Sequence, residues 1–166
     1  MSQKKSKKTE VNRKEFKKLL KLLDGIKGRP IDLESLGYKK IFLEIENGFN
    51  YYFNDSGMLL FFHGEDEKVF PALKLLRNSP EILANYPKVT LDGGAMTYIL
   101  NGADVFSPGI REAEIFGVDD VVIVLNDQKS PICVGTALYP NNDLPAKGKA
   151  IKSLHYLGDR LWSKTW

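Results

Sequence analysis

The sequence has little of the chemistry on which enzymes and metalloproteins depend. Its single cysteine, Cys133, excludes an internal disulfide and a cysteine-based zinc cluster. The two histidines, His63 and His155, have no partner at ligand spacing, so a histidine metal site is not expected. A glycine-rich dinucleotide fingerprint and a phosphate-binding loop are also missing. We therefore predict no catalytic residue, no metal and no cofactor, although a triad assembled from distant residues would leave no local motif.

Long apolar segments are missing too. The longest apolar runs, Met58–Phe62 and Val121–Leu125, are far shorter than the roughly 20 residues that cross a bilayer. The lysine-rich N-terminus leads into further charged residues, whereas a signal peptide would continue with an apolar region. These features predict a cytoplasmic protein.

Basic residues are abundant, and they are concentrated at the two ends of the chain. Residues 1–30 contain eleven basic and three acidic residues, and residues 147–166 contain five basic and one acidic residue. The net charge is nevertheless only +3, so the central part is acidic. Segregated lysines can attract a polyanion by releasing its condensed counterions, although for Lys4–Lys8 alone a solubilising tail is the simpler interpretation.

The N-terminal half begins with a basic arm, residues 1–11, that we expect to be flexible. Asn12 and Glu15 have the spacing of a capping box and predict the start of a helix. Its apolar residues recur at helical spacing, which indicates one core-facing stripe: Phe16, Leu19, Leu20 and Leu23. The rest of this helix carries basic residues, namely Arg13, Lys14, Lys17, Lys18 and Lys21.

The remaining pattern is one of short strands with a few short helices. In the first half we expect strands at 40–46, 51–54 and 58–63, and helices at 33–36, at 69–76 and after Ser79. In the second half we expect strands at 88–91, 103–106, 119–125, 132–139 and 149–156, and one helix at 93–100. Many short strands after one early helix are typical of a small barrel.

A further set of motifs in the second half resembles the PUA domain, an RNA-binding module named after pseudouridine synthases and archaeosine transglycosylases. These motifs occur in the order of that family and span nearly all of residues 88–156: Asp92-Gly93-Gly94-Ala95, Gly102-Ala103-Asp104-Val105, Pro108-Gly109, Asp119-Asp120-Val121-Val122-Ile123-Val124, Cys133-Val134-Gly135 and Lys147-Gly148-Lys149-Ala150.

Three other segments resemble the malignant T-cell amplified sequence family, whose module is shared with ligatin. They are Gly57–Phe62, Phe70–Leu76 and Leu154–Trp162. The resemblance implies an α+β chain with a pre-PUA α/β domain at 12–87, followed by a PUA mixed β pseudo-barrel at 88–166. The chain departs from that family in its short segment between Pro108 and Asp119 and in its basic arm.

The PUA resemblance also implies an RNA-binding surface. Gly93 and Gly94 would expose backbone N–H groups, and Gly102 and Ala103 would let an RNA backbone come close. The other expected members are Asp104, Lys147, Lys149, Lys152 and Arg160. The alternative for the glycines is that they only close a helix and form tight turns. For Tyr156, Trp162 and His155 we expect packing in the core.

Two classes of function follow from the resemblance. The first is an RNA-binding translation factor that acts on the small ribosomal subunit and tRNA in initiation, reinitiation or recycling. The alternative is an accessory subunit of an RNA-modification enzyme. The family also implies a SUI-domain partner resembling density-regulated protein, which the region of Phe61 and Phe62 or the pre-PUA surface would bind.

Overall fold

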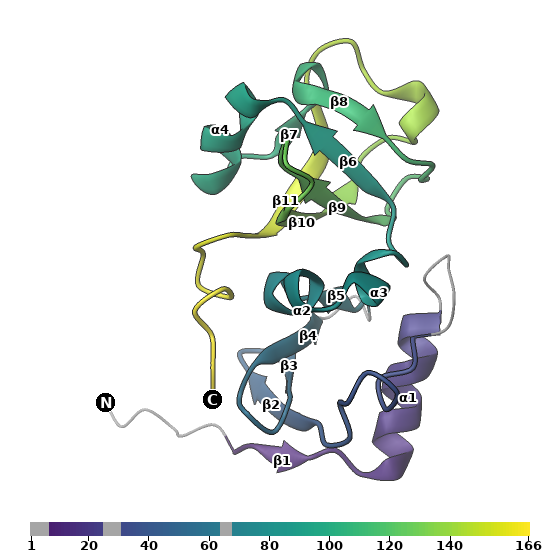
Figure 1. Ribbon diagram of the computed structural model, residues 1–166, viewed down its shortest axis with the longest axis vertical. Coiled ribbons are helices and arrows are strands. Elements are labelled where there is room, and N and C mark those ends of the chain that lie inside the picture. Colours follow the sequence, from purple (N-terminus) through teal and green to yellow (C-terminus); the bar gives the residue numbers. More distant parts are fainter. Residues whose placement is uncertain (1–6, 25–30, 64–67) are drawn as a thin grey trace.

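Two β-sheets are arranged one above the other along the long axis of the molecule (Figure 1). The computed structural model describes residues 7–24, 31–63 and 68–166. The first sheet is antiparallel, with the strand order β1-β2-β3-β4-β5, and the second has the order β7-β11-β10-β9-β6-β8. In the second sheet β6 and β9 pair in parallel, so this sheet is mixed. The expected α+β class with a mixed, nearly closed barrel is confirmed.

The strands of the first sheet are β1 (Thr9–Glu10), β2 (Phe42–Glu46), β3 (Phe49–Phe53), β4 (Leu59–His63) and β5 (Phe70–Pro71). Thr9 and Glu10 pair with Leu43 and Phe42. This part of the expected flexible arm is therefore a strand, because the edge of β2 offers backbone groups that β1 pairs with. Residues 1–6 of the arm lie outside the described residues.

Helix α1 (Arg13–Asp24) has the predicted capping box. The Asn12 N–H donates to Glu15 at 3.1 Å, and the Glu15 N–H donates to Asn12 Oδ1 at 3.0 Å. Leu19 and Leu23 are buried, with Phe16 and Leu20 packed against the same core. The apolar stripe predicted from the sequence is confirmed.

Helices α2 (Leu73–Asn78) and α3 (Pro80–Leu83) lie between the two sheets (Figure 1). The sequence predicted that α2 begins at Val69, which is wrong, because Phe70 and Pro71 form β5 on β4. Proline has no N–H to donate, so it suits an edge strand. The predicted helix at 33–36 is also wrong, and these residues form turns after Asp32.

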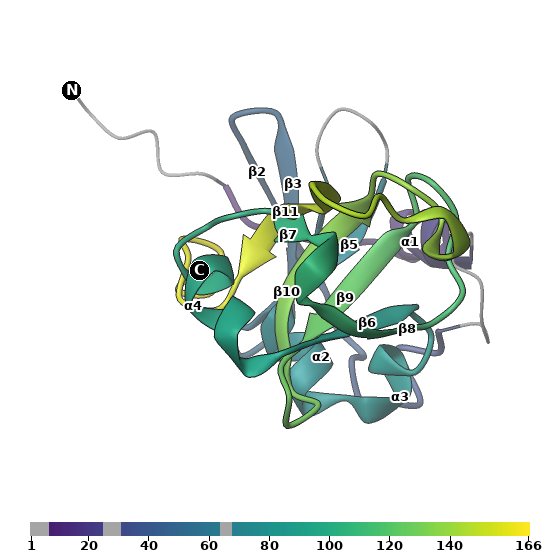
Figure 2. The ribbon, with the colours of Figure 1, turned by 90° about the horizontal axis from the view of Figure 1, so that it is seen from above.

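The second half contains β6 (Lys88–Leu91), η1 (Gly93–Ala95), α4 (Met96–Leu100), β7 (Val105–Phe106), η2 (Ser107–Gly109), β8 (Ile110–Ala113), β9 (Val121–Leu125), β10 (Pro131–Ala137), η3 (Asn141–Asp143) and β11 (Lys149–Tyr156). Strand β8 was missed from the sequence, because three of its four side chains are exposed and it has no alternating apolar pattern. The view from above shows these strands curving around a common interior (Figure 2).

The core is shared by both halves of the chain. Ile123, Leu125 and Val134 belong to the same buried cluster as the aromatic residues of the first sheet. The opposite side of the second sheet encloses a second cluster, which includes Val122, Val124 and Ile151. The two sheets are thus packed together through buried apolar surface, which contributes about 25 cal/mol per Å² removed from water.

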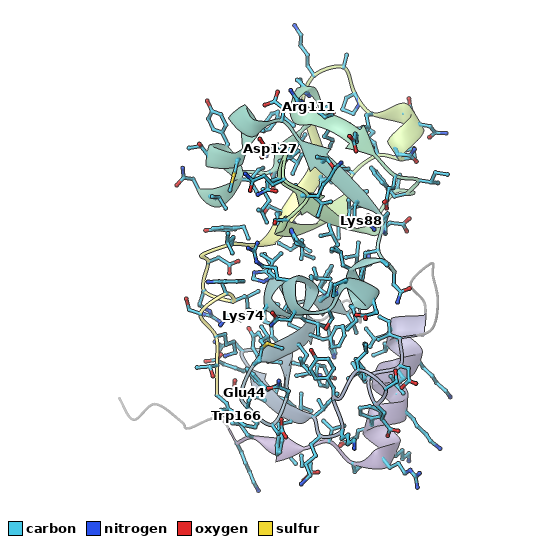
Figure 3. The ribbon with its side chains drawn as sticks, in the orientation of Figure 1. Glu44, Lys74, Lys88, Arg111, Asp127 and Trp166 are labelled. Atoms are coloured by element: carbon cyan, nitrogen blue, oxygen red, sulfur yellow. The ribbon has the colours of Figure 1, made fainter. Side chains whose placement is uncertain are left out.

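The C-terminal segment, residues 157–166, crosses one face of the first sheet (Figure 3). The Trp166 ring contacts Phe42 at a centroid distance of 4.7 Å. Lys164 pairs with Glu44 at 3.1 Å and with Glu46 at 2.9 Å. Burial opposes the charge on Lys164, but hydrogen bonds to Glu46 and Glu44 outweigh it and raise the pKa of Lys164. This segment is therefore a structural connection between the second half and the first sheet.

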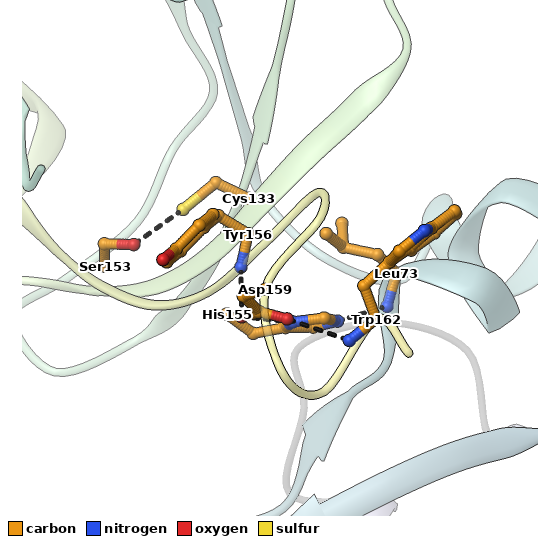
Figure 4. Close-up of polar contacts among 7 residues, drawn as sticks. All are labelled: Leu73, Cys133, Ser153, His155, Tyr156, Asp159 and Trp162. Atoms are coloured by element: carbon orange, nitrogen blue, oxygen red, sulfur yellow. Dashed lines mark hydrogen bonds and ion pairs between the residues drawn. The ribbon is translucent and has the colours of Figure 1, made fainter. Parts of the chain in front are cut away.

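A buried polar network at the end of β11 fixes where this segment begins (Figure 4). His155 is fully buried, and its Nε2 accepts the N–H of Leu73, the first residue of α2, at 3.1 Å. The ring proton must then be on Nδ1, which lies 2.9 Å from Asp159 Oδ2. Asp159 also accepts the N–H groups of Tyr156 and Trp162, each at 2.8 Å. The structural role expected for His155 is confirmed.

Asp159→Ala is expected to destabilise the protein by about 1–3 kcal/mol at neutral pH, because it leaves buried donors unpaired. Burial alone would raise the pKa of Asp159, but hydrogen bonds from His155, Tyr156 and Trp162 lower it below the ordinary 3.8. The stabilisation is therefore complete at neutral pH and is lost as the pH falls below about 4. Urea unfolding of both proteins at pH 7 and pH 3 measures this. A difference that does not shrink at pH 3 would contradict the ionic part of the explanation.

Candidate nucleic-acid interface

An aspartate caps η1, the short 3-10 helix that leads into helix α4. Asp92 Oδ1 accepts the N–H of Gly94 at 2.8 Å, which caps η1. A Cβ atom on Gly93 would lie 3.3 Å from the Asp127 carboxylate. The two exposed glycines thus have carboxylates beside them. They permit close approach of a ligand backbone, but this end of the helix is not a strong site for a phosphate.

The end of helix α4 explains Gly102. The N–H of Gly102 donates to Ile99 and that of Ala103 donates to Tyr98, both at 3.0 Å. With a φ of +89° at Gly102, this is the Schellman ending of a helix. The backbone conformation at the end of the helix therefore requires a glycine at position 102. This agrees with the alternative interpretation, in which the glycines close a helix and form tight turns.

Backbone hydrogen bonds bring three loops together beside α4. The Asp92 N–H donates to the Gly109 carbonyl at 3.0 Å, and the Ser107 N–H donates to the Gly148 carbonyl at 2.9 Å. Phe106 pairs with Lys149 across β7 and β11. We use the name α4 surface for a set of exposed residues on α4 and on the adjoining loops and strands: Gly93, Gly94, Tyr98, Phe106, Arg111, Lys147 and Lys149. The exposed Asp127 lies beside Gly93 at the border of this surface.

Asp104 organises the cationic side of the α4 surface. Its Oδ1 accepts the Ser153 N–H at 2.9 Å, and its Oδ2 pairs with Lys149 Nζ at 3.1 Å. The Lys149 side chain remains 58% exposed. Asp104 therefore holds Lys149 in place, and it also competes with any anion for that ammonium group.

Two of the expected site residues lie elsewhere. Lys152 pairs with Thr136, next to Val121, on the side of the second sheet that packs toward the first sheet. Arg160 lies over the first sheet, 3.5 Å from the Tyr51 hydroxyl and 3.9 Å from Glu46. The structure does not bring these two cations to the α4 surface.

Three residues of the α4 surface were not predicted from the sequence. Tyr98 is 69% exposed and Phe106 is 49% exposed. Arg111 is exposed in β8, and none of the ion pairs in the described part of the chain includes it. Phe106 follows the buried Val105 in a strand, so its outward position could have been inferred from alternation. Arg111 could not, because β8 itself was missed.

The expected core residues are placed as predicted. Cys133 is buried beside Ser153, and burial raises the pKa of its thiol to about 12. Trp162 packs against the core, with Lys74 Nζ 5.3 Å from its ring centroid. Phe61 and Phe62 are buried, so their side chains are not exposed for a partner to contact. Among the described residues no group of three or more His, Cys, Asp or Glu could hold a metal ion.

A pocket of about 410 Å³ lies at the other edge of the second sheet, between β6, β8 and α3. Its two lysines are already engaged. Lys88 pairs with Glu114 at 3.3 Å and donates to the Tyr86 carbonyl at 2.8 Å, and Lys129 pairs with Glu112 and with the Thr90 hydroxyl. We therefore do not assign an anion site to this pocket.

No helix in the described residues is long and apolar enough to cross a membrane.

Comparison with protein families identifies the second half. Residues 87–157 match the family model of the PUA domain. An uncharacterized protein of Methanocaldococcus jannaschii is 47% identical over 60% of this chain and 62% of its own length. Malignant T-cell-amplified sequence 1 of Rattus norvegicus is 34% identical over 64% of this chain and 61% of its own length. Translation machinery-associated protein 20 of Saccharomyces cerevisiae is 32% identical over 64% of this chain and 62% of its own length.

Solved structures share the fold over nearly the whole chain. A conserved PUA domain protein of Thermoplasma acidophilum has a TM-score of 0.76 and 25% identity, and covers 93% of this chain and 97% of its own. A hypothetical protein of Pyrococcus horikoshii has a TM-score of 0.75 and 27% identity, and the match covers 94% of this chain and 98% of that protein. The resemblance to the malignant T-cell amplified sequence family is confirmed, although the chain spans only about 61–62% of the length of the curated relatives it matches.

Gly102→Ala is expected to cost about 1–2 kcal/mol, because its φ of +89° is unfavourable for a residue with a Cβ atom. The new Cβ would also lie 3.3 Å from the Tyr156 ring. Gly148→Ala is the matched control, with a φ of +107° and nothing within 4 Å of its Cβ. Thermal unfolding of both variants separates the backbone cost from the contact with Tyr156. A Gly102→Ala protein as stable as the wild type would contradict the structural role.

Proposed function

We propose that this PUA-domain chain, a relative of the malignant T-cell amplified sequence proteins, is an RNA-binding translation factor that works without chemistry of its own. In this proposal it binds tRNA and the RNA of the small ribosomal subunit. The observation that carries the proposal is the α4 surface, where exposed cations and exposed aromatic rings gather around glycines. The step would be initiation, reinitiation or recycling, and the place of action the cytoplasm.

The chemistry of the α4 surface suits RNA in two ways. Lys147, Lys149 and Arg111 supply exposed positive charge, which attracts phosphates independently of sequence. Tyr98 and Phe106 offer exposed aromatic faces on which unpaired bases can stack, which is worth about 1–3 kcal/mol per base. Gly93 and Gly94 have no side chains, so an RNA backbone can come close to the protein backbone at these two residues.

Binding without catalysis agrees with the state of the reactive side chains. Burial holds the Cys133 thiol in its protonated form at neutral pH. His155 uses both ring nitrogens inside the protein. His63 accepts or donates hydrogen bonds with Asn50 and Tyr52, at 3.0 and 3.1 Å. These groups are engaged in the fold and not free to act on a substrate.

The name of the yeast relative connects that protein with the translation machinery. For this chain we propose the same setting, together with a SUI-domain partner. Since Phe61 and Phe62 are buried, such a partner would bind exposed parts of the first sheet. Co-sedimentation with ribosomes, with and without RNase treatment, tests the setting. Failure to sediment with small subunits would contradict the proposal that the chain acts on them.

Neutralising Lys147 and Lys149 together (Lys147→Gln, Lys149→Gln) is expected to weaken tRNA binding. The slope of log K against log salt should become shallower by about 0.7–0.9 for each phosphate that the variant no longer binds. Asp104→Asn should have the opposite effect and tighten binding, because it keeps the acceptor for Ser153 and removes the charge that pairs with Lys149. Filter binding at several salt concentrations measures both. Unchanged slopes would mean that these lysines do not touch the RNA.

Phe106→Ala is expected to weaken binding of single-stranded RNA by about 1–3 kcal/mol while leaving the salt dependence as it is. The reason is that stacking contributes no ion pair. Phe106→Tyr, which keeps the ring, is the matched control and should bind like the wild type. If both variants bind like the wild type, Phe106 does not stack on a base.

A further inference from the structure

The outer face of α1 is the most strongly basic surface of any described helix. Five cations share it: Arg13, Lys14, Lys17, Lys18 and Lys21. At 3.6 residues per turn they occupy an arc of about 140°. All five residues are exposed. The opposite face is committed to the core through Leu19 and Leu23.

In the part of the chain that the structure describes, no acidic side chain forms an ion pair with this face. Glu15, the acidic residue in its first turn, accepts the Asn12 N–H in the capping box. Lys39 and Lys40 add positive charge beside the start of the helix, because Ile41 accepts the Val11 N–H at 2.8 Å. Like charges held close together lower the stability of the folded protein, and a bound polyanion would offset their repulsion.

This face is far from the α4 surface. Helices α1 and α4 lie at opposite corners of the molecule in Figure 1 and on opposite sides of it in Figure 2. Seven residues separate Lys14 from Lys21, which corresponds to about 10 Å along the helix axis. That length faces about three phosphates of one strand, at about 3.4 Å of duplex axis for each.

We propose that the outer face of α1 is a second RNA-binding surface, which holds the phosphate backbone of an RNA segment other than the one at the α4 surface. The proposal rests on the proposed function in taking RNA as the polyanion. Binding here is independent of sequence, because the face offers lysine and arginine without an exposed aromatic ring. The protein thereby holds two RNA segments at a fixed separation.

A membrane is the other polyanionic surface that a basic helix can bind, and the packing of α1 argues against it. A helix that lies in a membrane interface inserts its apolar face between the lipids. In α1 that face is buried against the first sheet, and Leu22, 40% exposed, is its one large apolar residue at the surface. The helix therefore offers charge without an apolar face to insert.

The test neutralises four of the cations in the full chain (Lys14→Gln, Lys17→Gln, Lys18→Gln and Lys21→Gln), because glutamine has a similar helix propensity. Binding is measured with tRNA and with an RNA duplex of about 20 base pairs, which is longer than the roughly 16 base pairs that present two successive minor grooves. We expect affinity to fall about tenfold or more at about 0.1 M salt. The slope should become shallower by about 2–3, which is about 0.7–0.9 for each of about three phosphates. The same four positions changed to arginine form the matched control, and that variant should bind like the wild type.

Several outcomes would overturn the inference. If the glutamine variant binds RNA with wild-type affinity and slope while the Lys147→Gln, Lys149→Gln variant does not, α1 does not bind RNA and the proposed function stands. If the wild type binds neither RNA, the proposed function fails as well. If the glutamine variant loses binding only to vesicles containing phosphatidylserine, the surface belongs to a membrane contact. A circular-dichroism melt shows that each variant is folded, and a glutamine variant with a lost helix would be replaced by the pair Lys17→Gln and Lys21→Gln.

Discussion

A buried imidazole holds the two halves of this protein in one arrangement. His155 is the second-last residue of β11, and its Nε2 accepts the first N–H of helix α2, which belongs to the first half. Its other nitrogen is fixed by Asp159, which also accepts two backbone N–H groups of the C-terminal segment. Since a helix leaves its first N–H groups unpaired, this one would otherwise be an unsatisfied donor inside the core. The C-terminal segment then runs from this point across the first sheet to Trp166.

The parts of the fold that were predicted from the sequence are those encoded over short distances. The capping box of Asn12 and Glu15 and the stripe containing Leu19 and Leu23 needed only local spacing. Strand β8 needed its neighbour β6, because its own side chains are mostly exposed. The start of α2 was predicted too early, since β5 exists only through pairing with β4. Long-range pairing thus decided the elements that local patterns missed.

The difference between local and long-range information also explains which residues of the candidate site could be predicted from the sequence. Gly102 and Asp104 were predicted to bind RNA, and in the structure each of them also has a structural role. Gly102 ends a helix, and Asp104 holds Ser153 and Lys149. Lys152 and Arg160 are close to Lys149 in the sequence, but strand alternation and the path of the C-terminal segment carry them to other faces. The exposed aromatic residues of the α4 surface were missed because exposure of a single aromatic residue depends on how its element packs.

A continuous core has a consequence for how such a protein selects RNA. Ile123 and Val134 of the second sheet are buried in the same cluster as the aromatic residues of the first, so the two halves do not move independently without exposing apolar surface. The α4 surface and the outer face of α1 are then held at one separation and orientation. In the proposed function, neither phosphate contacts nor stacking on Tyr98 and Phe106 reads the base sequence, so this fixed geometry would supply the selectivity. On this proposal the RNA that binds best would be the one whose fold presents two backbone segments at the matching distance, so its shape would be recognised in place of its sequence.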